Sequence, residues 1–193
     1  MREKLNAKDL INVGIYTTMY LVVFFIVGMI NAVPILYPVS LFIIPIVTGI
    51  PFMLFTTKVN KSGMVFIMSL ILGIFWFAIG YTWLPFLTYC IAGLITELIF
   101  KAAHFKNFKI LKVGYCVFCM GAIGCTLPMW VMADTYMAYV EEQMGTQYVK
   151  QLAYYMPWWM SIVGLVIIGI GALIGGALGK KMLQKHFKRA GIA

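Results

Sequence analysis

The chain has 193 residues, of which 63% are apolar and only 11% are charged, and its formal net charge is +9. A soluble domain carries about 25% charged residues, so the composition excludes a soluble globular protein. The basic residues lie in short segments beside apolar runs and accompany no RNA- or DNA-binding motif, which argues against a nucleic-acid partner. Residues 1–193 are therefore predicted to form a single integral membrane domain.

Four segments contain no charged residue and no histidine, and each is long enough for at least one crossing of about 20 residues. The two longest are divided at turn signals, where a helix ends at least cost. These signals are residues 31–34 with Pro38, and residues 80–85. The division predicts an all-α bundle of six transmembrane helices. In chain order they are Leu10–Ile30, Val39–Thr57, Met64–Gly80, Leu84–Phe100, Val113–Ala133 and Pro157–Gly179.

Lysine and arginine are distributed unevenly over the predicted connections. Fourteen of the fifteen lie on the same side as the two termini, and Lys150 lies on the other. Cytoplasmic loops retain positive charge, so both termini are predicted to be cytoplasmic.

The longest predicted connection, about residues 134–156, then lies on the outer side as a lid over the bundle. We predict two short helices in it. Asp134 or Thr135 would cap the first, Gly145 would end it, and Thr146 would cap the second.

Aromatic side chains gather at the outer helix ends and in the lid. Two interpretations stay open: an interfacial belt at the level of the lipid headgroups, or a pocket for a flat heterocycle, where stacking contributes about 1–3 kcal/mol per ring. Within the lid, Tyr148, Leu152 and Tyr155 recur at helical spacing and can cover the mouth of the bundle. The pocket interpretation predicts these substrate-binding residues: Tyr37, Tyr81, Trp83, Trp130, Asp134, Tyr136, Tyr155 and Trp158.

Charged residues of the lid have two interpretations each. Asp134 can accept hydrogen bonds from ligand N–H groups or pair with a ligand cation, and a helix cap at the water interface explains it equally well. Lys150 can meet a ligand carboxylate or pair with Glu141 and Glu142.

Glu97 is the acidic residue within a predicted span, which makes it a candidate functional group. It precedes Lys101 by four residues near the cytoplasmic end, so an interfacial ion pair is the simpler interpretation. Cys116 and Cys119 form a C-x-x-C inside an apolar helix with no histidine nearby. We interpret them as packing residues and predict no metal site.

Small residues recur at four-residue spacing in two predicted helices. Gly171, Gly175 and Gly179 allow close packing inside the bundle. Gly14 and Thr18 form either an internal contact or an external docking stripe. No catalytic set is present, such as a serine with a histidine partner, a metalloprotease motif or a phosphate loop, so the protein is predicted to be neither an enzyme nor dependent on a cofactor.

Several stretches resemble the S components of energy-coupling factor (ECF) transporters, and the similarity extends over nearly the whole chain. More narrowly, the chain is similar to the MptD-type group, also called Trep_Strep. The stretches are Tyr37 with Pro38, residues 49–59, Gly63, and residues 71–73, 130–134 and 156–158.

The resemblance implies a membrane subunit that captures a vitamin-like micronutrient outside the cell, and the aromatic residues with Asp134 suggest a planar nitrogen heterocycle. It also implies partners, namely a transmembrane coupling subunit and two cytoplasmic ATPases. S components dock through an A-x-x-x-A stripe on the first helix; the matching positions are Gly14 and Thr18, which are small but depart from alanine. The alternative is a small channel or an accessory subunit of another membrane complex.

Overall fold

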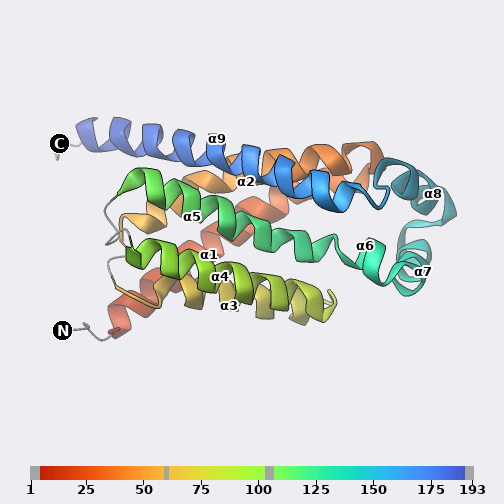
Figure 1. The fold of residues 1–193 in the computed structure, drawn as a ribbon, viewed down its shortest axis with the longest axis horizontal. Coiled ribbons are helices and arrows are strands. Elements are labelled where there is room, and N and C mark those ends of the chain that lie inside the picture. The colour runs from red at the N-terminus through yellow and green to blue at the C-terminus, as the bar shows by residue number, and fades with distance from the viewer. Residues whose placement is uncertain (1–4, 59–60, 103–106, 190–193) are drawn as a thin grey trace.

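The computed structural model describes residues 5–58, 61–102 and 107–189, and every regular element in these ranges is helical. The long helices run side by side in one bundle (Figure 1). In chain order the α-helices and the 3-10 helices, marked η, are α1 (Ala7–Gly28), η1 (Met29–Ala32), η2 (Pro34–Leu36), α2 (Tyr37–Thr56), α3 (Met64–Ala78), α4 (Trp83–Ala102), α5 (Phe108–Met120), η3 (Gly121–Cys125), α6 (Pro128–Val131), α7 (Ala133–Met144), α8 (Thr146–Tyr155) and α9 (Met160–Arg189).

Five of the described helical segments are long and apolar enough to cross a membrane: Ala7–Ala32, Pro34–Thr56, Trp83–Ala102, Phe108–Cys125 and Met160–Lys185. The remaining apolar helix, α3, has 15 residues and packs along α4. At 1.5 Å per residue it is about 22 Å long, shorter than a hydrocarbon core of roughly 30 Å. The predicted multi-pass membrane protein is confirmed, and the count of six crossings stays a prediction.

The bundle has two distinct ends. α1 begins and α9 ends at one of them, here called the terminal end, and α7 and α8 lie at the other, here called the lid end (Figure 1). The two lid helices meet at Gly145, whose φ of 86° favours glycine. No side chain caps either helix. The predicted caps Asp134, Thr135 and Thr146 are therefore wrong, because α7 starts earlier, at Ala133, and Gly145 itself separates the two helices.

The predicted helix Val113–Ala133 is interrupted in the structure. α5 changes into the 3-10 turn η3 at Gly121, and α6 is a single helical turn. A Cβ at Gly124 would lie 2.6 Å from the Cα of Pro85 in α4, and the Thr88 hydroxyl donates to the Gly121 carbonyl at 2.7 Å. This close approach of α4 to η3 favours the tighter turn.

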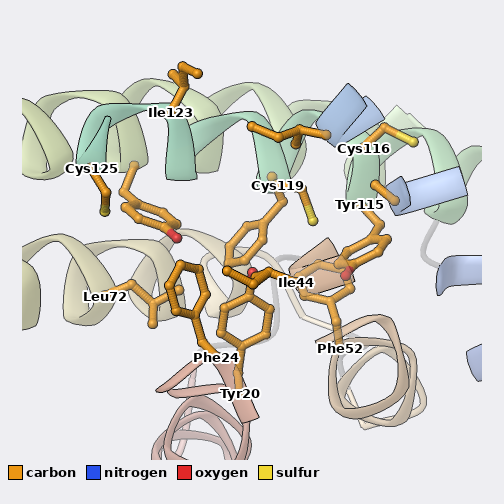
Figure 2. Close-up of a cluster of buried hydrophobic side chains, with 14 of the residues drawn as sticks. Tyr20, Phe24, Ile44, Phe52, Leu72, Tyr115, Cys116, Cys119, Ile123 and Cys125 are labelled. Carbon is orange, nitrogen blue, oxygen red and sulfur yellow. The ribbon is translucent and has the colours of Figure 1, made fainter. Parts of the chain in front are cut away.

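Aromatic side chains fill the centre of the bundle (Figure 2). The ring of Phe52 in α2 lies 4.7 Å from those of Tyr115 and Phe118 in α5. The Tyr115 hydroxyl donates to the Pro45 carbonyl at 2.5 Å and so joins α5 to α2. Cys119 is buried in the same cluster, in agreement with its predicted packing role.

Glycines let α9 approach the backbone of α2. A Cβ at Gly171 would lie 2.5 Å from the Phe42 carbonyl oxygen, and one at Gly179 would lie 2.6 Å from that of Gly49. A Cβ at Gly175 would also overlap the backbone of α2. The predicted internal packing of these glycines is confirmed.

Gly14 and Thr18 lie on the side of α1 that faces away from the bundle. A Cβ built on Gly14 meets nothing within 4 Å, and the exposed Thr18 donates its hydroxyl to the Gly14 carbonyl at 3.0 Å. Ile11, Ile15 and Val22 are exposed on the same side. The internal-contact interpretation of this pair is therefore wrong, and the docking interpretation stays open.

Glu97 is buried at the terminal end and caps a neighbouring helix. Its carboxylate accepts hydrogen bonds from the backbone N–H groups of Gly63, at 2.7 Å, and Phe66, at 3.3 Å, at the start of α3. The unpaired N–H groups of a helix start attract a carboxylate. This contact takes the place of the predicted ion pair with Lys101.

Candidate ligand-binding site

A cavity of about 660 Å³ lies at the lid end. Pockets of roughly 300–1,000 Å³ hold drug-sized ligands. The walls come from the α1–α2 connection, the α3–α4 connection and the lid. The lining residues are Gly28, Met29, Asn31, Ala32, Tyr37, Ile79, Gly80, Tyr81, Thr82, Met132, Thr135, Tyr136, Tyr139, Val140, Gln143, Met144, Tyr148 and Leu152.

The α3–α4 connection holds Tyr81 in a defined position. The Tyr81 N–H donates to the Trp76 carbonyl at 3.0 Å, and the Gly80 N–H donates to that of Phe77 at 3.2 Å. Gly80 has a φ of 98°, so α3 ends in a Schellman motif. The Tyr81 ring then packs edge-on against the buried Trp76 ring, with centroids 5.0 Å apart.

One face of α7 supplies the outer wall. At about 100° per residue, its lining residues fall within one face, whereas Asp134 points about 170° away from the centre of that face. Asp134 is exposed, in the first turn of α7, where a carboxylate is favourable for the helix dipole. The structure therefore places this predicted ligand contact outside the cavity. The α7 residues that line the cavity are Thr135, Tyr136, Tyr139, Val140, Gln143 and Met144.

α8 holds the lid against the bundle. The Tyr148 hydroxyl donates to the Asn31 carbonyl at 2.6 Å, and Leu152 is 1% exposed. Both residues line the cavity, in agreement with the stripe predicted to cover the mouth of the bundle. Tyr155 of the same stripe lies outside the lining. Lys150, exposed on α8, also lies outside it.

The structure brings together three of the eight predicted substrate-binding residues. Tyr37, Tyr81 and Tyr136 all line the cavity. Their contact with a ligand stays a prediction.

The predicted tryptophans lie at the lid end but outside the cavity. Trp83 is 54% exposed and Trp158 is 72% exposed, as expected of rings in an interfacial belt. The Trp130 indole N–H donates to the Met156 carbonyl at 3.0 Å and joins α6 to the segment before α9. Of the predicted aromatic residues, Tyr37, Tyr81 and Tyr136 therefore fit the pocket interpretation, whereas Trp83 and Trp158 fit the interfacial belt and Trp130 joins two segments of the bundle.

Three tyrosines of the cavity that lie outside the membrane-spanning helices, Tyr81, Tyr136 and Tyr148, are neutral at physiological pH. Burial raises the pKa of Tyr136 to about 12 and also raises the pKa values of Tyr81 and Tyr148. Among the described residues, those that line the cavity include no Asp, Glu, Lys, Arg or His. The site therefore offers rings, hydroxyls, carboxamides and thioethers without a formal charge.

Sequence reasoning missed Asn31 and Gln143 as polar lining residues. Both outer connections and the lid were expected on one side, so topology indicated that residues 28–32 and 79–82 face the lid. Which side chains point inward could not be found in this way. The Asn31 Oδ1 is buried without a hydrogen-bond partner in the described part of the chain, and we expect this carboxamide to reorient when a ligand N–H is present.

The family of the chain follows from its comparison with known proteins. A family model described as a hypothetical bacterial integral membrane protein (Trep_Strep) matches residues 7–189, which include the whole bundle and the lid. No curated protein and no solved structure matches the chain significantly. The protein is therefore a multi-pass protein of the cell membrane and belongs to the Trep_Strep family of bacterial integral membrane proteins.

Proposed function

We propose that the protein is the substrate-binding S component of an ECF transporter and captures a vitamin-like planar heterocycle for ATP-driven import. The observation that carries this proposal is the tyrosine-lined cavity beneath the lid. A channel would need a path through the bundle, and aromatic side chains fill the centre of this one (Figure 2). A site closed at one end is the arrangement that a binding subunit needs.

The lid end faces the outside of the cell in this proposal. Described basic residues cluster at the terminal end, and the positive-inside rule assigns that end to the cytoplasm. Both termini are then cytoplasmic, and α3 makes the sixth crossing, with local thinning of the bilayer around its short span. The lysines at the terminal end include Lys8, Lys58, Lys61, Lys101, Lys109, Lys112, Lys180, Lys181 and Lys185.

The cavity can supply a useful affinity without a charged contact. Stacking on two rings contributes about 2–6 kcal/mol, and three neutral hydrogen bonds contribute about 1.5–4.5 kcal/mol. Together these are on the order of the 8 kcal/mol of a micromolar complex. Burial of further apolar surface strengthens binding beyond that value.

The outward face of α1 is the proposed docking surface for the transmembrane coupling subunit, which two cytoplasmic ATPases drive. Gly14 leaves open space on this face, and small residues allow close helix contact within a membrane. Replacing Gly14 and Thr18 together with leucine should disrupt the transporter complex while binding at the lid end persists. Copurification of the coupling subunit measures this, and an intact complex would contradict the docking proposal.

Mass spectrometry of small molecules extracted from the mildly detergent-purified protein tests the function. A heterocycle present at one molecule per chain would support the S component and identify its substrate. A preparation that is repeatedly empty after growth in rich medium would favour an accessory subunit. Unchanged uptake of every vitamin tested in a deletion strain that retains the ATPases would also contradict the proposal.

A further inference from the structure

The polar side chains that line the cavity share one property, which is that none of them is Asp, Glu, Lys, Arg or His among the described residues. Hydroxyls come from two threonines and five tyrosines of the lining, and carboxamides come from Asn31 and Gln143. The remaining lining atoms among the described residues are aliphatic, aromatic, thioether or backbone. Such a surface can donate and accept hydrogen bonds but cannot neutralise an ion.

The charged residues of the lid lie outside this surface. Asp134 and Glu141 are seven residues apart on α7, on the side opposite the cavity, and both are exposed. Glu141 accepts a hydrogen bond from the Thr146 hydroxyl at 2.6 Å. Glu142 is exposed beside the lining, and Lys150 is exposed on α8. The lid thus presents its charges to solvent and its neutral groups to the cavity.

An ion that entered this cavity would lose its hydration without gaining a counterion, which disfavours binding strongly. An uncharged molecule would lose only hydrogen bonds that the hydroxyls and carboxamides can replace.

We infer that the cavity selects an uncharged ligand, a neutral ring-bearing molecule with amide- or alcohol-type groups, and rejects carboxylates, phosphates and ammonium cations. This inference rests on the proposed function, which places a small ligand in the cavity. It replaces the prediction that Asp134 pairs with a cationic group of the ligand. The phenols of Tyr81, Tyr136 and Tyr148 agree with it, because burial raises their pKa values further above the ordinary value of about 10.

The first test uses the molecule that copurifies with the full-length protein. This molecule is released by denaturation and passed at neutral pH over a strong anion exchanger and a strong cation exchanger. We expect it in the flow-through of both. Retention on either resin would overturn the inference and leave the S-component function standing, whereas a repeatedly empty preparation would overturn the proposed function and this inference with it.

A second test places a charge of either sign at the rim of the cavity. Gln143 is exposed there, so Gln143→Glu and Gln143→Lys should fold, and Gln143→Met is the neutral control. Both charged variants should retain several-fold less of the copurifying molecule than Gln143→Met. Glu142→Gln, a charge change outside the lining, should retain as much as the wild type. Higher retention in one charged variant would show a ligand of the opposite charge and overturn the inference.

Discussion

The Tyr148 hydroxyl provides a direct test of how the lid is held closed. It donates a 2.6 Å hydrogen bond to the Asn31 carbonyl and so joins α8 to the α1–α2 connection. Tyr148→Phe removes this bond and keeps the ring that lines the cavity. Tyr154→Phe is the matched control, because that ring is 78% exposed on the same helix.

The size of the effect follows from the strength of one neutral hydrogen bond. Such a bond contributes about 0.5–1.5 kcal/mol net, so its loss should raise the open fraction of the lid about 2- to 13-fold. Leu152 stays 1% exposed beneath α8 and continues to hold the lid. We therefore expect more frequent opening of a lid that still docks.

Hydrogen exchange of the α7 and α8 backbone amides measures this opening, because exchange through local opening scales with the open fraction. Exchange should become about 2- to 13-fold faster in Tyr148→Phe and stay at the wild-type rate in Tyr154→Phe. Equal protection of the lid in all three proteins would refute the role of this hydrogen bond.

Three further predictions concern the bundle and the cavity. Gly175→Leu should lower the free energy of unfolding by about 1–3 kcal/mol, since its side chain would overlap the backbone of α2. Gly14→Leu should not lower it, because that position has open space; equal Tm values for the two variants would contradict the packing argument. Glu97→Gln should lower the free energy of unfolding by about 1–2 kcal/mol through loss of a charged helix cap, and Lys101→Gln should not lower it. An equal loss in Lys101→Gln would support the ion-pair interpretation of Glu97 instead. Because burial raises the pKa of Tyr136 to about 12, above the value of about 10 in an unfolded chain, its contribution to lid stability should be complete below about pH 10 and be lost between about pH 10 and 12. Retention of the copurifying molecule across this range measures it, and release that is complete near neutral pH would contradict it.

Helix positions could be predicted from the sequence to within a few residues at most ends. The predicted span Met64–Gly80 compares with Met64–Ala78 in the structure, and Leu84–Phe100 compares with Trp83–Ala102. The prediction failed for Val113–Ala133, which is broken at η3. Apolar run length carries no information on the close packing of α4 that accompanies this break.

The candidate site shows the same limit more sharply. Asp134 and Tyr136 are two residues apart on α7, which turns them about 200° from each other. Only Tyr136 lines the cavity. A sequence places both residues in the lid, but the rotation of a helix about its own axis depends on its neighbours. Trp83 in α4 and Trp130 in α6 were misplaced for this reason.

The sequence by itself determined the membrane class of this protein, the approximate positions of most of its helices, and the lid with its turn at Gly145. These features follow from local properties, namely the length of apolar runs and the conformations that glycine and proline favour. Only the tertiary structure decided which side chains face the cavity, and that Glu97 caps α3 instead of pairing with Lys101. Such contacts join residues far apart in the chain, so they depend on how the helices pack.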